Sequence, residues 1–234
     1  DPVRAKGDGH WKKGESLPGM PAEMWDLWPG ELEESEIGEI PKGWEVVSLS
    51  ERCKTQYGYT ASATKEPIGP HLLRVTDINK SPWIDWHGVP FCPISESERQ
   101  KYALSEGDIV VARMADPGKC AIIEGPANAV FASYLVRLRV GGLARAYYTF
   151  YFLRSASYQD YAQGAKSGSV QANMNARIIV DVPHLDPPQR ALDAFLRLVA
   201  PLRRKVVANL GEQSTLGQTR DTLLPKLLSG EIRV

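Results

Sequence analysis

The sequence predicts an α+β fold in which a mixed domain of short strands and few helices precedes one long C-terminal helix. Two observations carry this prediction. Short apolar runs recur through the middle of the chain between turn-forming residues, as expected of strands. From residue 186 onward, apolar residues recur instead at seven-residue spacing, which is typical of a long amphipathic helix with a coiled-coil-like face. We therefore divide the chain into residues 1–36, 37–185 and 186–234.

Residues 1–36 are expected to form a linker or an extended wrap, because glycine and proline are frequent and apolar periodicity is weak. Met24, Trp25 and Trp28 interrupt this polar stretch. We favour packing against a neighbouring part of the protein as their role. A platform for stacking bases is the alternative, and it fits less well beside so many acidic residues.

Residues 37–185 are expected to form the mixed domain. A turn-rich entry at residues 38–44 leads into its first strand. Helices are expected at residues 144–155 and 156–163. The remaining apolar runs predict strands at residues 45–49, 71–78, 107–113 (after a short turn), 120–123, 132–140 and 178–182.

The C-terminal helix has a well-marked predicted start. Asp186 fits the N-cap, Pro187 the first helical position, and Gln189 completes a capping box. About 35 residues at ~1.5 Å each make a helix of ~50 Å. Such a helix is too long to bury its whole apolar stripe against one modest domain, so we expect a spacer or a partner surface. Pro201 is expected to kink the helix or to disturb one of its hydrogen bonds, and a short turn is expected to end it near residues 223–232.

The overall charge is balanced, with 28 basic and 28 acidic residues, but the two signs are segregated along the chain. Residues 1–46 hold 5 basic and 11 acidic residues (net −6), residues 47–186 hold 15 and 13 (net +2), and residues 187–234 hold 8 and 4 (net +4). An acidic entry and a basic exit neither demand nor exclude binding to nucleic acid.

The three cysteines are scattered and form no Cys-x-x-Cys pair, which favours buried thiols in a reducing cytosol. The sequence contains no run of 18 apolar residues and no recognisable signal peptide. It begins at Asp1 rather than at methionine, so we expect a fragment or a processed end.

Motifs for catalysis are not found. The four histidines lack the spacing of zinc or nucleophile–base sites, and neither a phosphate-binding loop nor a glycine-rich dinucleotide motif occurs. Asp186-Pro187-Pro188-Gln189 is similar to the motif with which amino-methyltransferases hold a flipped adenine, but Gln189 replaces the stacking aromatic residue. We therefore expect no catalytic residue, no metal and no cofactor.

Two polar loops are candidates for binding. In the first, Asp116-Pro117-Gly118 makes a tight turn that would hold Arg113 and Lys119 toward one face. Arginine grips guanine or phosphate with two hydrogen bonds, and lysine is a point charge for phosphate. The alternative is a solvated hairpin with a local salt bridge to Asp116.

The second loop covers residues 164–175. Ser169, Gln171 and Asn173 alternate, which in an extended chain places them on one face, and glutamine and asparagine pair well with adenine. Lys166 and Ser167 precede them. A flexible connector is the alternative reading of this composition.

A third candidate is the stretch around Gly58. Lys54, Tyr57 and Tyr59 would contact a sugar-phosphate backbone if they were exposed. Burial of both tyrosines in the core is the alternative.

Taken together, these stretches resemble the specificity (S) subunits of type I restriction-modification systems. The resemblance covers nearly the whole chain. Its matching stretches, in order, are residues 38–44, 57–60, 73–78, 107–113 with 118–119, 168–171, and the ending Leu223-Leu224-Pro225-Lys226-Leu227-Leu228-Ser229-Gly230-Glu231-Ile232; residues 1–6 resemble the piece that follows the central helix of full-length subunits.

The resemblance implies a non-catalytic DNA reader in the cytoplasm of a bacterium or archaeon. Such subunits carry two recognition domains, set apart by two antiparallel helices, that each read half of a bipartite target on double-stranded DNA. Methylation (M) subunits dock on the helices and methylate adenine, and restriction (R) subunits add cleavage. The resemblance also adds Arg74 and Thr76 to the DNA-binding candidates.

The chain departs from this pattern in two ways. Met114-Ala115-Asp116-Pro117 follows Arg113, where relatives often carry threonine and glycine, so base contacts do not transfer directly. The chain also has one recognition domain and one long helix, and is a fragment or a natural half-subunit. As a hypothesis, two copies pair and read a palindromic, interrupted target. Their contacts would be the helix residues Leu192, Phe195, Val199, Leu202, Val206 and Leu216.

Two other functions remain open at the level of sequence. One is a methyltransferase or nuclease in its own right, which the absent motifs argue against. The other is a truncated scaffold or inhibitor that binds methylation subunits without reading DNA.

Overall fold

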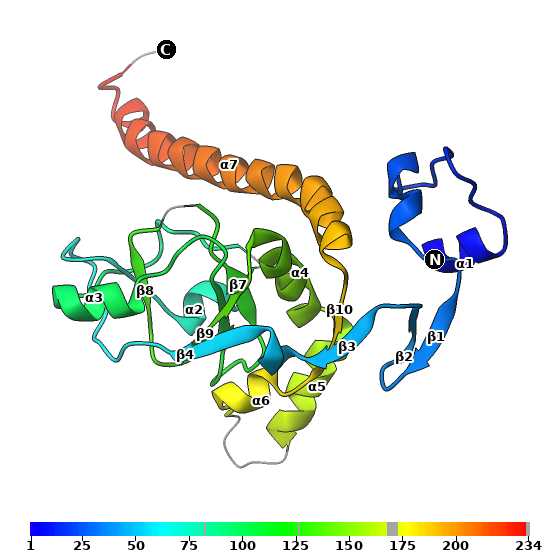
Figure 1. The fold of residues 1–234 in the computed structure, drawn as a ribbon. Coiled ribbons are helices and arrows are strands. Elements are labelled where there is room, and N and C mark those ends of the chain that lie inside the picture. Colours follow the sequence, from blue (N-terminus) through cyan, green and yellow to red (C-terminus); the bar gives the residue numbers. More distant parts are fainter. Residues whose placement is uncertain (82, 126, 168–172, 233–234) are drawn as a thin grey trace.

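The predicted α+β class is confirmed in the structure, a computed structural model that describes residues 1–81, 83–125, 127–167 and 173–232 (Figure 1). A mixed domain occupies the middle of the chain, and one long helix crosses it. The elements are, in order, α1 Pro2–Gly7, η1 Ala22–Leu27, β1 Leu32–Ser35, β2 Gly38–Pro41, β3 Glu45–Ser48, η2 Leu49–Glu51, β4 Cys53–Tyr57, β5 His71–Leu73, α2 Val75–Ile78, α3 Glu96–Tyr102, β6 Ile109–Ala112, β7 Cys120–Ile122, β8 Ala129–Phe131, β9 Leu135–Val140, α4 Leu143–Leu153, α5 Ala156–Ser167, α6 Ala176–Val180, β10 Pro183–Asp186 and α7 Gln189–Leu228.

The centre of the domain is an antiparallel sheet in the order β4-β9-β6-β7. Strand β6 is buried at all four residues, and its alternation sends successive side chains to two cores. Ile109 and Val111 face a core shared with α4, α5 and α6. Val110 and Ala112 face a second core that contains residues of β5, α2 and β8. Both faces of the sheet are therefore covered.

Two further strand pairs complete the domain. β3 pairs with β10, which joins the entry of the domain to its exit. β5 and β8 pair in parallel. Because β3 and β10 are neighbours, the chain leaves the domain close to where it entered, and α7 starts from this point.

Two segments differ from the prediction. Residues 71–78 were expected to form one strand, but β5 ends at Leu73 and α2 follows. Asp77 is responsible, because its carboxylate accepts hydrogen bonds from the backbone and side chain of Arg74 and caps a helical turn. Residues 178–182 were expected to be a strand but lie mostly in α6, because the Asn175 side chain caps that helix at Ile178.

The first segment of the chain packs around Trp11, whose side chain is buried together with Met24 and Ala194 of α7. Its tryptophans contribute to this cluster, as the packing interpretation expects. The Lys6 ammonium lies 3.6 Å from the centre of the Trp25 ring and donates hydrogen bonds to the carbonyls of Trp25 and Trp28. The structure thus contains α1, η1 and β1 where the composition indicates linker or extended chain.

Helix α7 begins two residues later than predicted, at Gln189, and Pro188 rather than Asp186 occupies the N-cap. The predicted capping role of Asp186 is wrong, because its carboxylate accepts hydrogen bonds from Arg52, at 2.7 Å, and from Arg145. The helix continues through Pro201 and Pro225 to Leu228. Figure 1 shows a bend in the N-terminal part of α7, the part that contains Pro201.

Candidate nucleic-acid interface

The loop between β6 and β7, residues 113–119, is folded tightly against the domain. The Gly118 amide donates to the Ala112 carbonyl at 3.1 Å, and the Lys119 amide donates to the Asp116 carbonyl at 3.2 Å. Ala115 has a φ of 64°, a left-handed conformation that favours glycine. Ala115 therefore holds a backbone conformation that glycine adopts at lower cost.

Gly118 sets the position of this loop. Its φ is +86°, and a Cβ atom there would lie 2.6 Å from the Cβ of Ala162 in α5. The Gln159 side chain, also in α5, donates to the Gly118 carbonyl at 3.0 Å. A side chain at position 118 would therefore prevent the loop from resting directly on α5.

Arg113 is the residue at which three segments meet. Its guanidinium carbon lies 5.0 Å from the centre of the Tyr57 ring at the end of β4. One guanidinium nitrogen donates to the side-chain oxygen of Asn173 at 3.1 Å. The backbone amide donates to the Tyr134 carbonyl at 3.0 Å, and the Nε atom is buried without a hydrogen-bond partner in the described part of the chain. Tyr57 and Asn173 thus hold the guanidinium in place.

The Asp116 carboxylate does not pair with its loop neighbours as the solvated-hairpin interpretation expects. It accepts a hydrogen bond from the Asn79 side chain at 2.7 Å, and no ion pair of Asp116 occurs among the residues that the structure describes. Lys119 is exposed at the far end of the turn. The loop therefore presents cations whose charge Asp116 does not neutralise by direct contact.

Of the two tyrosines around Gly58, only one is substantially exposed. Tyr57 is 44% exposed, and its hydroxyl accepts a hydrogen bond from the Ala176 amide at 2.9 Å. Tyr59 is half-buried, with its ring 5.3 Å from that of Tyr102. A Cβ atom on Gly58 would lie 2.2 Å from the Ala132 carbonyl oxygen, so glycine is needed where this strand end approaches residues 131–132.

Tyr134 is a candidate that the sequence analysis missed. It is 56% exposed, and its carbonyl accepts the hydrogen bond from the Arg113 amide. The sequence places it inside a predicted strand at residues 132–140, but β9 begins only at Leu135. An exposed tyrosine just before a buried strand is the signal that was available.

The structure separates the remaining candidates. Lys54 pairs in register with Arg139 and lies on the face of the sheet opposite to Tyr57, since side chains alternate along β4. Arg74 is held by Asp77 through two side-chain hydrogen bonds of 3.0 and 2.8 Å, and this contact raises the pKa of its guanidinium. Thr76 is exposed on α2. The side chains of Lys166 and Ser167, and all of Ser169 and Gln171, lie outside the described residues.

The predicted pairing stripe of α7 divides into two parts. Leu192 is buried, and Phe195 and Val199 pack against the core that α4 lines, so the chain itself uses these three. Val206 is half-buried. Leu202 and Leu216 are 66% and 68% exposed. Only the second part of the stripe is free for a partner.

Two ion-pair groups hold the chain where it enters α7 and along the helix. At Asp186, the last residue of β10, burial by itself acts to raise the pKa, but the hydrogen bonds from Arg145 and Arg52 hold it below its usual value. Farther along, Arg203 donates two hydrogen bonds, of 2.8 and 2.6 Å, to Glu124, which also accepts one from Tyr147. The helix therefore has a fixed direction relative to the candidate interface.

Within the described ranges, no group of three or more potential metal ligands is found, and no described helix is long and apolar enough to cross a membrane.

The fold and the site define a class of protein in which a compact domain presents a cationic, aromatic loop cluster and is joined rigidly to a long helix. No family model matches the chain. It is 28% identical over 203 residues to the type I restriction enzyme MjaIX specificity subunit of Methanocaldococcus jannaschii, covering 84% of this chain and 46% of that protein. It is 22% identical over 197 residues to the HindI specificity subunit of Haemophilus influenzae, covering 82% and 42%.

Solved structures show the same fold. The S subunit of a type I system from M. genitalium matches with a TM-score of 0.57 at 14% identity, covering 80% of this chain and 46% of that one. The HsdS subunit from Thermoanaerobacter tengcongensis matches with a TM-score of 0.51 at 15% identity, covering 86% and 48%. The resemblance to type I specificity subunits is therefore confirmed in sequence and in fold. The chain spans less than half the length of the curated relatives cited here.

Proposed function

We propose that this chain is a sequence-specific DNA-recognition subunit of a type I restriction-modification complex in the cytoplasm of a bacterium or archaeon. In this role it binds double-stranded DNA, directs adenine methylation and restriction to a bipartite target, and has no catalytic activity of its own. Methylation and restriction subunits are its protein partners. The similarity to specificity subunits along most of the chain supports the assignment.

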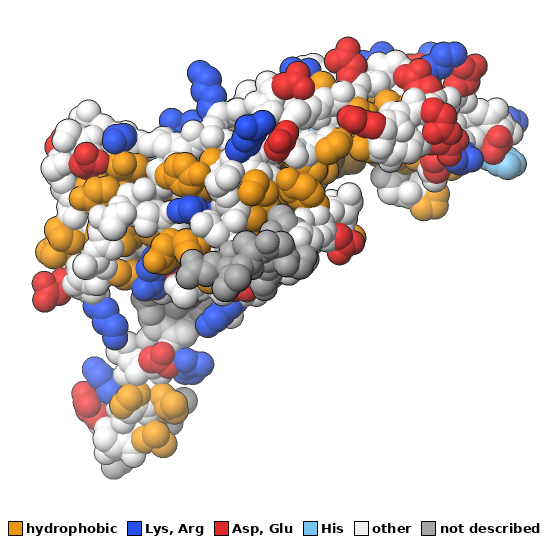
Figure 2. Space-filling model, turned by 90° about the horizontal axis from the view of Figure 1, so that it is seen from below, with side chains coloured by type: hydrophobic (Ala, Val, Ile, Leu, Met, Phe, Trp, Pro, Cys, Tyr) orange, Lys and Arg blue, Asp and Glu red, His pale blue; other side chains and the backbone are white. Residues whose placement is uncertain are grey.

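The position of Arg113 is the single observation that carries the DNA-reading part of the proposal. An arginine that stacks on Tyr57 and donates to Asn173 is pre-organised, so less side-chain entropy is lost when it binds a base edge or a phosphate. Lys119 and Tyr134 are exposed, and their carbonyls accept hydrogen bonds from the amides of Ala112 and Arg113. Figure 2 shows that Asp and Glu side chains gather toward the end of the molecule formed by the first segment of the chain.

The direct test measures DNA binding by the complex reconstituted with its methylation subunits. Arg113→Ala should weaken specific binding by about 1–3 kcal/mol if Arg113 reads a base, and Arg113→Lys should not restore it. Lys119→Ala should weaken binding to all sequences and reduce the salt slope by about one if Lys119 contacts a phosphate. Gln171→Ala tests, in the same DNA-binding assay, whether the second loop contributes to binding.

Arg204→Ala is the matched control, since Arg204 is an exposed cation on α7 outside the loop. Unchanged affinity in Arg113→Ala, Lys119→Ala and Gln171→Ala would contradict the proposed reading residues. It would favour the alternative of a scaffold that binds methylation subunits without reading DNA.

We also propose that two copies act together, since one copy supplies one recognition domain and one helix. A two-fold pair would place two identical readers at a fixed separation and would select an interrupted palindrome. The exposed leucines in the second part of α7 support this pairing.

A further inference from the structure

Arg113 and Asn173 form a side-chain pair whose hydrogen-bonding roles are fixed by their chemistry. A guanidinium group donates and never accepts, so the amide atom that lies 3.1 Å from a terminal nitrogen of Arg113 is the Asn173 oxygen. The amide nitrogen of Asn173 is therefore not engaged by Arg113 and keeps its two N–H donors. Asn173 is exposed, so a ligand can approach this group.

The backbone keeps the two residues together. The Met174 amide donates to the Arg113 carbonyl at 2.9 Å, and Met114 pairs with Asn173 as an isolated antiparallel bridge. Met174 is fully buried, which anchors the segment that carries Asn173. The side-chain contact therefore joins two segments that are already paired, and DNA binding does not have to create it.

Tyr57 restrains the guanidinium as a second neighbour. Its ring centre lies 5.0 Å from the guanidinium carbon of Arg113. The Tyr57 hydroxyl accepts a hydrogen bond from the Ala176 amide at 2.9 Å, and this bond fixes the position of the ring. The cation–π contact holds the guanidinium without offering it an oxygen or nitrogen acceptor.

The pair presents N–H donors to a ligand. The Nε atom of Arg113 is buried without a partner in the described part of the chain, so it is closed to a base. The two terminal nitrogens carry four N–H groups, and among the described residues Asn173 takes one of them, which leaves three. The Asn173 oxygen keeps a second lone pair, but a donor that approached it would lie beside the N–H group that Arg113 already donates there, and like dipoles repel.

A donor-only surface is complementary to an edge that carries only acceptors. In the major groove, guanine presents the two acceptors N7 and O6, whereas adenine presents the acceptor N7 and the amino donor N6. A phosphate also carries only acceptors, but it can be approached from many directions and gains little from a restrained cation. A base edge presents its acceptors in one plane, so it gains most from a guanidinium that two neighbours hold.

We propose that Arg113 reads a guanine of the DNA half-site through N7 and O6 in the major groove. Asn173 and Tyr57 are positioning residues, which contact Arg113 rather than the base. The inference rests on the proposed function, because it names the base that this site selects. Asn173 does not read adenine in this assignment, since Arg113 engages the oxygen that an adenine amino group would need.

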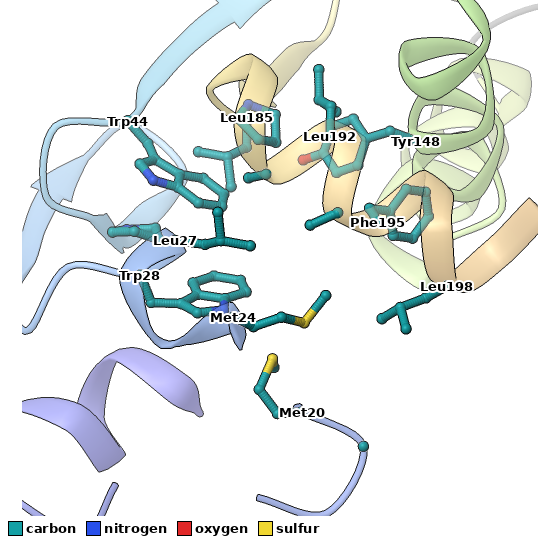
Figure 3. A pocket seen from close by; sticks show the side chains of 15 residues that line it. Met20, Met24, Leu27, Trp28, Trp44, Tyr148, Leu185, Leu192, Phe195 and Leu198 are labelled. Carbon is teal, nitrogen blue, oxygen red and sulfur yellow. The ribbon is translucent and has the colours of Figure 1, made fainter. Parts of the chain in front are cut away.

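The apolar cavity beside the start of α7 offers no comparable discrimination between bases (Figure 3). It has a volume of about 360 Å³, and no charged residue of the described structure lines it. The Trp28 and Trp44 rings at this cavity stack on each other with centroids 5.2 Å apart. Aromatic rings accept every base, because every base has a π face. Base selection is therefore assigned to Arg113 and not to this cavity.

Selection of DNA from a randomised library tests the assignment. The complex reconstituted with its methylation subunits is used, and the bound DNA is sequenced for the parent chain and for each variant. Arg113→Ala should abolish a preference for guanine at one position of the half-site, a loss of about tenfold to 100-fold in discrimination. Arg113→Lys should lose the same preference, because a lysine cannot donate in the bidentate geometry.

The positioning residues should affect the same position of the DNA. Asn173→Ala and Tyr57→Leu should each weaken the guanine preference there by roughly threefold to tenfold, because Arg113 is then less well held. Gln100→Ala is the matched control, since Gln100 is an exposed amide of α3 that donates to Glu96 in the same helix. It should leave the preference at every position unchanged.

Base analogues test the parent chain without any substitution. 7-Deazaguanine at the selected position lacks the N7 acceptor and should weaken binding by about tenfold. Inosine keeps N7 and O6 and lacks only the minor-groove amino group, so binding should stay within about twofold. With Arg113→Ala, 7-deazaguanine should have no further effect. Weaker binding with inosine but not with 7-deazaguanine would overturn the assignment, because the contact would then lie in the minor groove.

Two results with the variants would also overturn the assignment. If Asn173→Ala removed a preference for adenine at a different position, Asn173 would read a base of its own. If Arg113→Ala kept the guanine preference and lowered the salt slope by about one, Arg113 would contact a phosphate.

The failure of this assignment is distinguishable from the failure of the proposed function. A complex that selects a sequence in which the Arg113-dependent base is not guanine contradicts the guanine assignment alone. A complex that selects no sequence at all contradicts both.

Discussion

At the scale of single residues, the sequence identifies Arg113 and Asn173 as polar candidates but does not predict their contact. They are 60 residues apart, and the contact depends on how the loop around Gly118 rests on α5. The sequence also identifies Tyr57 as a candidate, but it does not decide whether the tyrosine is exposed or buried. Lys54 has the right chemistry but alternates to the other face of β4, a result that depends on strand register and not on residue type.

Gly118 offers a residue-scale prediction about stability. Gly118→Ala should destabilise the protein by about 2–4 kcal/mol, because a left-handed conformation costs alanine ~1–2 kcal/mol and a crowded methyl adds strain against Ala162. Gly125→Ala is the control, since its φ is +74° but a Cβ atom there would meet nothing within 4 Å. Gly125→Ala should lower the free energy of unfolding by about 1 kcal/mol. Equal midpoints in urea unfolding for the two variants would contradict this account of the loop.

His184 gives a residue-scale prediction about pH. It is fully buried beside the Tyr148 and Phe152 rings with both ring nitrogens unpaired in the described structure, and burial lowers its pKa to about 4. Below its unfolded pKa of about 6.5 the unfolded chain takes up the proton first, so stability falls as the pH drops from about 6.5 toward 4. Between pH 7.5 and pH 5, His184 should lower the free energy of unfolding by about 2 kcal/mol.

Denaturant unfolding of His184→Leu at the two pH values checks this. The variant should be close to the parent chain at pH 7.5, because no hydrogen bond to the ring is lost, and it should lose markedly less stability at pH 5. The same pH dependence in both proteins would show that another group is responsible.

At the scale of elements, patterns with long periods were predicted correctly and local capping was not. The long helix is evident from the seven-residue spacing of its apolar residues. It begins later than predicted because the Asp186 carboxylate accepts hydrogen bonds from Arg52 and Arg145, which lie far from it in the sequence. The expected strand at residues 178–182 is short and apolar, and such runs fit helix and strand equally well. Asn175 decides the outcome by capping α6.

The attachment of α7 to the domain yields an element-scale prediction. Arg203→Ala should destabilise the protein by about 3–5 kcal/mol, because Glu124 would be left buried without its cation. Arg204→Ala, one residue away and exposed, should change stability by less than about 0.5 kcal/mol. Similar losses in the two variants would mean that the Arg203–Glu124 pair does not fix the helix.

At the scale of the whole molecule, we propose three parts: a DNA-reading loop cluster, a long helix fixed to it, and a second copy that completes the target. The class of fold and the resemblance to specificity subunits followed from ordered motifs along the chain. Pairing does not follow from the helix stripe as first predicted, because Leu192, Phe195 and Val199 pack within one chain. The free part of the stripe and the cavity beside Trp28 are visible only in three dimensions.

The central claim is that two identical readers, held at a fixed separation, direct adenine methylation. Single-molecule sequencing of DNA from cells that carry this chain together with its methylation subunits measures this most directly. The account predicts methylated adenine in an interrupted palindrome, with two inverted half-sites and a spacer of constant length, and loss of that motif with Arg113→Ala. A motif with two unrelated half-sites, or one that persists unchanged with Arg113→Ala, would contradict it.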